Sequence, residues 1–252
     1  SGTTNTLFGD LPGAMHVPKP KIAPCEPWTL TELLNYEKEV TGMFMSGHPL
    51  DHFRFELKHY EITNIADFNE VRDALVEGSS LGKMYRVAGL VTDVQHRMTK
   101  TGKNFGSFVI EDYSGKTEYM LWSEDYIKYK DYLEKGQNIL LNGYFRNRYN
   151  QPNLFEFKIS SMSLLETVKQ QLTRSVEINM HPSAVTPAMV GFIEKNLKTY
   201  PGKSTLRINI MEPKENLKIS MYTIERGFQM NEEMADYLMN NLDVEVKVGL
   251  VS

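Results

Sequence analysis

Two polar stretches, residues 95–105 and 146–153, contain cations and aromatic rings but no acidic residue. Cationic side chains bind phosphates, and aromatic rings stack on bases with little dependence on base sequence. The whole chain has 32 acidic and 28 basic residues, so two basic stretches without an acid are informative. We therefore predict contacts to a nucleic-acid strand from a set of residues in and near them: Arg97, Lys100, Lys103, Asn104, Phe105, Tyr119, Arg146, Arg148 and Tyr149.

The net charge of −4 hides an uneven distribution along the 252 residues. Residues 1–82 carry 6 basic and 12 acidic side chains, whereas residues 83–161 carry 12 basic and 9 acidic ones. The last part, residues 162–252, is nearly balanced, with 10 basic and 11 acidic side chains. The positive charge therefore lies in the same part of the chain as the two basic stretches.

Residues 83–161 have the alternation of strands, and they predict a five-stranded barrel. Strands are expected at 85–95, 106–111, 116–122, 138–146 and 154–160, with a helix at 123–133 capped by Ser123 and a bulge or bend at Gly89. This order is that of an OB-fold, which binds oligonucleotides across strands 2 and 3, between the strand 1–2 and 4–5 loops. The two basic stretches are these two loops.

The third strand offers two aromatic side chains on opposite faces, Tyr119 and Trp122. Successive side chains of a strand point to opposite sides of the sheet, so at most one of the two rings can be an exposed stacking platform. We favour Tyr119 for that role. On the second strand, Phe108 is predicted to lie in the barrel core.

The fold class predicted for the whole chain is multidomain, α+β and all-β. Five of the eleven prolines lie within residues 9–27, so residues 1–28 are a tail and linker, and residues 29–82 are a helical segment that begins with a capping box at Thr29 and Glu32. One of its helices should bury Leu50, Phe53, Leu57 and Tyr60. Residues 83–161 are the OB-fold, and residues 162–252 are a C-terminal domain with the order βαββαβ.

The sequence lacks the residue patterns that several other activities need. No carboxylate cluster suited to two metal ions and no phosphate loop with Lys-Ser/Thr is found, so we predict no catalytic site, metal or cofactor here. His48 and His52 are separated by Pro49, and His48 is better explained as the cap of a turn. The lone Cys25 permits no internal disulfide, and no apolar run approaches the ~20 residues that span a bilayer.

Two motifs resemble the C-terminal region of the bacterial DNA polymerase III alpha subunit family. They are Ser46-Gly47-His48-Pro49-Leu50-Asp51, which follows a helical stretch, and Phe108-Val109-Ile110-Glu111-Asp112-Tyr113-Ser114-Gly115. The turn Tyr200-Pro201-Gly202 resembles part of the C-terminal domain of that family. The likeness covers nearly all of the chain, with its motifs in the family's order.

The resemblance implies a non-catalytic part of a longer replicative DNA polymerase of the bacterial cytoplasm. The polymerase active site, with its magnesium ions, would lie upstream. The OB-fold would bind single-stranded template DNA, and the C-terminal domain would bind the tau subunit of the clamp loader. Leu7 and Phe8 match the apolar pair of the family's peptide for the sliding clamp, although Thr4 stands where that peptide has glutamine.

Two alternatives remain open from the sequence. One is an independent OB-fold that binds RNA, such as a tRNA-binding module. The other is a protein-interaction module whose basic loops serve only solubility.

Overall fold

The longest strand, β1 (Met84–Met98), organises a five-stranded antiparallel sheet in the order β3-β2-β1-β4-β5. Residues 84–90 of β1 pair with β4, and residues 90–98 pair with β2, so β1 bends between two partners. Gly89 lies at this bend, where a Cβ atom would come within 2.9 Å of the Glu111 carbonyl oxygen. The ladder is irregular between Val91 and Asp93, so the predicted bulge lies just after Gly89. The other strands are β2 (Asn104–Glu111), β3 (Lys116–Trp122), β4 (Asn138–Arg148) and β5 (Gln151–Leu164).

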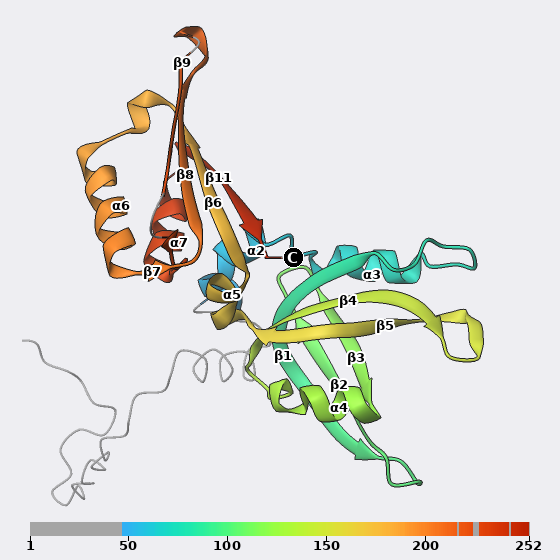
Figure 1. Cartoon of the computed structure of the whole chain (residues 1–252). Coiled ribbons are helices and arrows are strands. Elements are labelled where there is room, and N and C mark those ends of the chain that lie inside the picture. Colours follow the sequence, from blue (N-terminus) through green and yellow to red (C-terminus); the bar gives the residue numbers. More distant parts are fainter. Residues whose placement is uncertain (1–46, 216, 224–226, 242, 252) are drawn as a thin grey trace, which may run out of the picture.

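The sheet curls around a core of aromatic and branched side chains, which confirms the predicted OB-fold (Figure 1). Phe108 is 1% exposed and belongs to this core, as predicted. Between β3 and β4 lie α4 (Ser123–Tyr129) and the short helix η2 (Lys130–Tyr132). The predicted cap at Ser123 is wrong: Trp122 is the N-cap, no side chain caps the helix, and Ser123 has a φ of 46°.

The described residues are 47–251 of this computed structural model, except 216, 224–226 and 242. The helix predicted to begin at Thr29 and the pair Leu7 and Phe8 lie outside this range. The described helical segment consists of η1 (Pro49–Phe53), α2 (Arg54–His59) and α3 (Ile65–Asp73).

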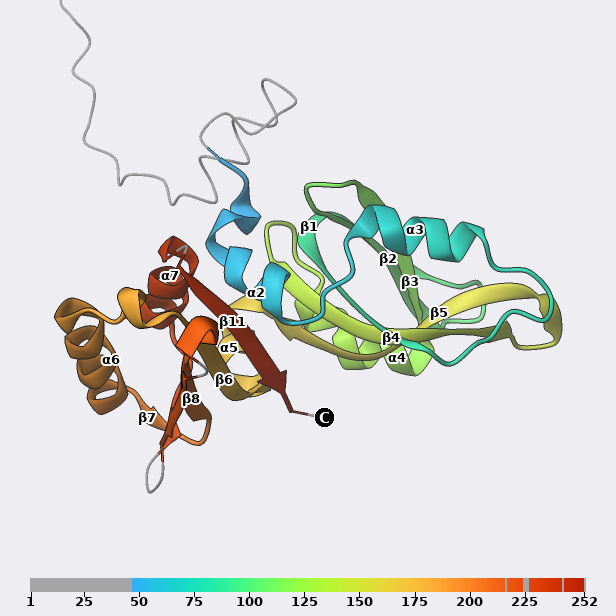
Figure 2. The same cartoon turned by 90° about the horizontal axis from the view of Figure 1, so that it is seen from above.

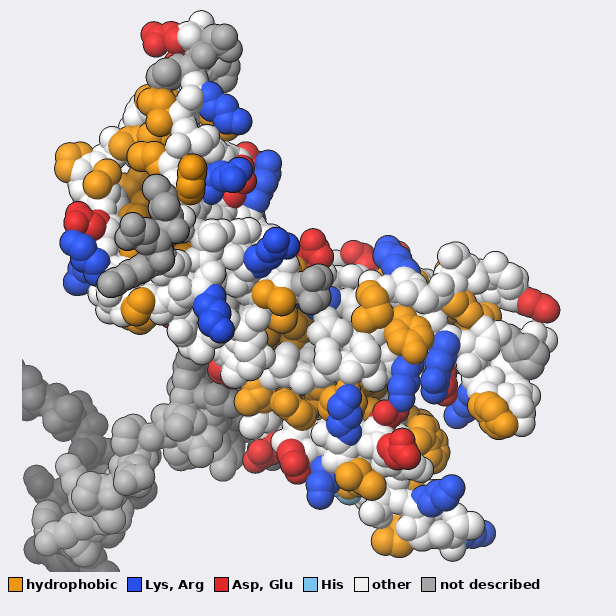
Figure 3. All heavy atoms as spheres, in the orientation of Figure 1, with side chains coloured by type: hydrophobic (Ala, Val, Ile, Leu, Met, Phe, Trp, Pro, Cys, Tyr) orange, Lys and Arg blue, Asp and Glu red, His pale blue; other side chains and the backbone are white. Residues whose placement is uncertain are grey.

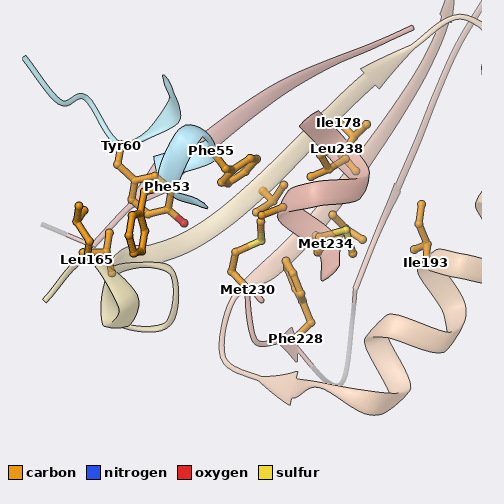
Figure 4. Close-up of a cluster of buried hydrophobic side chains, with 14 of the residues drawn as sticks. Phe53, Phe55, Tyr60, Leu165, Ile178, Ile193, Phe228, Met230, Met234 and Leu238 are labelled. Atoms are coloured by element: carbon orange, nitrogen blue, oxygen red, sulfur yellow. The ribbon is translucent and has the colours of Figure 1, made fainter. Parts of the chain in front are cut away.

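This segment divides its contacts between two hydrophobic cores. Phe68 of α3 packs into the barrel core, 5.3 Å from the ring of Phe145. Phe53, Phe55 and Tyr60 pack instead with the C-terminal domain, in the cluster drawn in Figure 4. Figure 2 shows α2 between the two sheets, which places the segment at the joint of the molecule.

The turn between β2 and β3 fastens the helical segment to the barrel. Asp112 Oδ2 accepts a hydrogen bond of 2.9 Å from the Ile65 amide at the start of α3. The Tyr113 ring lies 4.5 Å from that of His48, and its hydroxyl donates to Asp51. His48 caps η1 as predicted, because its Nδ1 accepts from the Leu50 amide at 3.0 Å. The motifs at residues 46–51 and 108–115 therefore contact each other.

The C-terminal domain has a four-stranded sheet in the order β11-β6-β8-β9, and β6 and β8 are parallel. Helices α6 and α7 cover one face of this sheet (Figure 1). Thr186 caps α6, with its Oγ1 3.2 Å from the Met189 amide. The elements are α5 (Leu165–Leu172), β6 (Thr173–Met180), η3 (Pro182–Ala184), α6 (Pro187–Thr199), β7 (Pro201–Gly202), β8 (Thr205–Glu212), η4 (Pro213–Glu215), β9 (Leu217–Tyr222), β10 (Gly227–Phe228), α7 (Glu232–Asn240) and β11 (Val244–Leu250).

An ion cluster with a buried Lys–Glu pair and one exposed acid connects the helical segment to the C-terminal domain. Lys169 of α5 pairs with Glu56 of α2 and with Glu232 of α7, the latter at 2.7 Å. The side chains of Lys169 and Glu56 are 6% and 0% exposed, and burial raises the pKa of Glu56 against the opposing effect of Lys169. The prediction did not include α5, the helix that supplies the shared cation.

Candidate nucleic-acid interface

The outer face of β2 and β3 presents a row of paired side chains. Phe105 lies opposite Trp122, and Ser107 lies opposite Met120. Trp122 is 42% exposed and Met120 is 46% exposed, because these two side chains alternate with Tyr119 and Leu121, which point into the core. This face is therefore apolar and accessible at the end of β3.

Phe105 and Trp122 form a stacked pair, with ring centroids 4.7 Å apart and planes 14° from parallel. Each ring sits on a strand and is supported by the other, so little side-chain freedom is lost when a third ring stacks on the pair. Stacking on bases is the chemistry such a pair supports.

The prediction that Tyr119 is an exposed stacking platform is wrong. Tyr119 is only 5% exposed, and its ring is packed against Phe68, Phe108 and Phe157. Trp122, which the sequence placed on the opposite face, has the exposure that the role needs.

The hairpin between β1 and β2 carries exposed cations along its length. Both strands continue further than predicted, so the connection is a tight turn in which the Thr99 amide donates to the Lys103 carbonyl oxygen at 2.8 Å. Arg97 lies opposite Phe105, and its guanidinium donates to Gln95. Within the described part of the chain, no salt bridge neutralises the predicted contacts Arg97, Lys100 and Lys103, and Asn104 beside them is also exposed.

The hairpin between β4 and β5 ends in a two-residue turn, Tyr149 and Asn150. Asn150 has a φ of 56°, a left-handed conformation that asparagine tolerates better than most residues. Tyr149 is 88% exposed, as a stacking side chain must be. The two cations before it differ, since Arg146 pairs with Glu156 at 2.6 Å, whereas Arg148 forms no salt bridge among the described residues.

Two adjoining hollows connect the second hairpin to β3. The first, of about 240 Å³, lies between β3 and β5, and the second, of about 420 Å³, lies under the β4–β5 hairpin. Met120, Trp122 and Arg148 line both hollows, and Tyr149 lines the second.

The tips of the two hairpins diverge in Figure 1, so they do not form a groove by direct contact. Trp122 connects them instead, because it stacks on Phe105 at the base of one hairpin and lines the hollow beside Arg148 of the other. Blue and orange side chains lie side by side over this part of the barrel in Figure 3, with some red acidic side chains among them. The face can therefore offer cations for phosphates and rings for bases along one path.

The described residues include no group of three or more His, Cys, Asp or Glu side chains arranged to hold a metal ion. None of the described helices is long and apolar enough to span a bilayer.

Two families of known domains match the chain. Residues 85–165 match the OB-fold nucleic acid binding domain, and residues 176–249 match the C-terminal domain of the DNA polymerase III alpha subunit. The first match covers the barrel with its candidate interface, and the second covers the four-stranded sheet with α6 and α7.

Among curated proteins, several relatives are named DNA polymerase III subunit alpha. The protein of Bacillus subtilis is 25% identical over 201 residues, which are 80% of this chain and 17% of the relative. That of Haemophilus influenzae is 26% identical over 184 residues, 73% of this chain and 15% of the relative. That of Escherichia coli K12 is 29% identical over 137 residues, 54% of this chain and 11% of the relative. The chain therefore spans less than a fifth of the length of these relatives.

Proposed function

Because the chain resembles the C-terminal region of DNA polymerase III alpha subunits, we propose that its barrel binds single-stranded DNA during replication. The observation that carries the proposal is the stacked pair Phe105 and Trp122, which lies between the cations of the first hairpin and Arg148 of the second, none of which has a salt-bridge partner among the described residues. Phosphates would bind Arg97, Lys100, Lys103 and Arg148, and bases would stack on Trp122 and Tyr149.

The same resemblance supports two tethers to the replication machinery. Leu7 and Phe8 would bind the sliding clamp, and the C-terminal domain would bind the tau subunit of the clamp loader in the bacterial cytoplasm. Exposed apolar side chains of the C-terminal domain, Ile219 and Met221 on the edge strand β9 and Val190 on α6, support a protein partner for this domain. Tethers of this kind raise the effective concentration of a weak DNA-binding domain on its strand.

Polymerisation itself would belong to other parts of such a protein. We propose that the longer chain is a DNA-directed DNA polymerase whose catalytic domain holds the magnesium ions. The part described here would then position the template strand and contribute no catalytic residue.

The test is a titration of fluorescent oligo-dT with the 252-residue chain at several salt concentrations. Each phosphate contact on a single strand contributes about −0.7 to the slope of log K against log salt, so four contacts predict a slope of about −3.

Replacing Trp122 with Ala should weaken binding by roughly 5- to 150-fold at every salt concentration, because the stacking of one base contributes about 1–3 kcal/mol. Absence of binding at low salt would contradict the proposal.

The two arginines of the second hairpin provide a matched control. R148Q should lower both the affinity and the slope, because Arg148 has no salt-bridge partner among the described residues. R146Q should change the slope less, because Glu156 already neutralises Arg146. Equal effects of the two variants would show that the ion pair does not decide which cation binds phosphate.

A comparison with RNA tests the other class of nucleic acid. If an oligo-U strand of the same length binds more tightly than oligo-dT, the result favours an RNA partner instead.

A further inference from the structure

The barrel is open between its two edge strands. In the sheet order β3-β2-β1-β4-β5, β3 and β5 are the edges, and the hollow of about 240 Å³ lies between them. Six aromatic residues line it, Phe68, Tyr119, Trp122, Phe145, Phe155 and Phe157, together with Thr117, Met120 and the charged residues Arg72, Glu118, Arg148 and Glu156. Ring walls combined with convergent polar and charged groups suit a flat organic ligand with polar edges.

One polar group in this lining has no partner. The hydroxyl of Tyr119 is buried and makes no hydrogen bond with any described residue. Native proteins satisfy nearly all buried polar groups, so an isolated one calls for an explanation, such as a ligand. Burial raises the pKa of Tyr119, so the hydroxyl keeps its proton and can donate at neutral pH.

Charged side chains lie around the same hollow. The Arg72 guanidinium donates a hydrogen bond to the Thr117 hydroxyl, with Nη1 3.0 Å from Oγ1. Arg148 has no ion-pair partner in the described ranges. Trp122 and Arg148 also line the neighbouring hollow with Tyr149, so the slot opens directly onto the proposed path of the strand.

We propose that the slot between β3 and β5 holds one unpaired base of the bound DNA strand. The base would lie between the ring walls, its edge would accept a hydrogen bond from Tyr119, and the adjoining phosphate would bind Arg148. This inference rests on the proposed function and adds to it a defined position for a base taken out of the stack.

The test compares two strands of equal length and charge, oligo-dT and an abasic strand without bases, on the wild-type chain and on Y119F. The variant removes only the unpartnered hydroxyl. It should weaken binding of oligo-dT by roughly 5-fold, the value of one net hydrogen bond. It should leave binding of the abasic strand unchanged, and it should raise the thermal unfolding midpoint because an unsatisfied buried group is removed.

Y113F serves as the control, because Tyr113 donates to Asp51 and lines neither hollow. It should lower the unfolding midpoint without changing either affinity. Equal affinities of wild type and Y119F for oligo-dT, or equal losses on both strands, would overturn the base site.

Two further results separate the alternatives. If the wild-type chain binds neither strand at low salt, the proposed function fails, and the base site fails with it. If thymidine monophosphate alone binds the wild type as tightly as oligo-dT and loses affinity in Y119F, the slot is a site for a free nucleotide, and the strand-bound form of the inference is wrong.

Discussion

At the scale of single residues, Asp51 joins three parts of the molecule. Its carboxylate accepts from the Tyr113 hydroxyl, the His48 amide at 3.0 Å and Arg54 at 3.2 Å. Burial raises the pKa of Asp51, but these three donors outweigh it and hold the pKa below its usual value. A barrel turn, the η1 turn and the next helix are therefore connected through one side chain.

Tyr113 should make this connection sensitive to alkaline pH. Burial, and then the bond to Asp51, raise the pKa of Tyr113 to about 12. A raised tyrosine pKa favours the folded state while the hydroxyl is protonated. The stabilisation is thus complete below pH 10, the unfolded value, and is lost as the pH rises through about 12.

We predict that Y113F lowers the free energy of unfolding by about 0.5–1.5 kcal/mol at pH 8, the net value of one hydrogen bond. The difference from wild type should shrink toward pH 12, as urea denaturation at several pH values would measure. If the difference stays constant up to pH 12, the contribution of Tyr113 to the stability of the folded state does not depend on its hydroxyl proton. The ring contact with His48 remains in the variant, so it cannot produce the pH dependence.

The error at Tyr119 shows what alternation along a strand can and cannot predict. Two side chains three positions apart lie on opposite faces, and Tyr119 and Trp122 do. Which face is buried depends on partners distant in sequence, here Phe68 of α3 and Phe157 of β5. Similarly, the sequence of the second hairpin shows two arginines but not that Glu156 neutralises the first.

At the scale of elements, the approach of β5 to β4 depends on Gly143. A Cβ atom there would lie 2.7 Å from the Phe157 ring and closer still to the Lys158 carbonyl oxygen, which is backbone and cannot rotate away. The same glycine lies beside an irregularity in the β4–β5 ladder. Gly191 in the middle of α6 has open space at the same position.

We predict opposite effects for alanine at these two glycines. G143A should destabilise the chain by about 1–3 kcal/mol through overpacking, whereas G191A should stabilise it by about 0.4–1 kcal/mol through helix propensity. Thermal unfolding of the two variants beside the wild type measures both. A stable G143A would indicate that β5 can shift away from β4.

The number, type and order of the barrel strands were predicted correctly, because alternation and turn residues are local signals. The strand ends were less well predicted, since β1 and β2 extend into the basic hairpin as a ladder that needs no apolar side chains. Helix α5 was missed because its eight residues carry glutamines and Lys169, whose burial is explained only by acids from α2 and α7. That pairing cannot be read from the local sequence.

At the scale of the whole molecule, Lys169 should couple the stability of the C-terminal domain to the helical segment. K169M leaves Glu56 buried without its cation, so we predict a loss of about 3–5 kcal/mol at pH 8. Burial raises the pKa of Glu56, and the loss of Lys169 raises that pKa further. In the variant, the Glu56 carboxyl therefore becomes protonated as the pH falls. The loss should therefore be smaller at pH 5 than at pH 8 in denaturant unfolding.

A second substitution tests whether charge is the cause. In K169M/E56Q neither buried charge remains, and most of the lost stability should return at pH 8. If the double variant is as unstable as K169M, the loss comes from packing against Phe53, which lies 5.9 Å from the Lys169 ammonium, and not from the carboxylate.

The open edges of the barrel also affect how copies of this chain behave toward each other. Unpaired strand edges invite pairing with another chain, and charged side chains along an edge oppose it. β3 carries exposed Lys116 and Glu118, and β5 carries Glu156 and Lys158. Variants that neutralise these charges should therefore self-associate more readily. A DNA strand bound over the slot should in turn reduce aggregation of the chain that binds it.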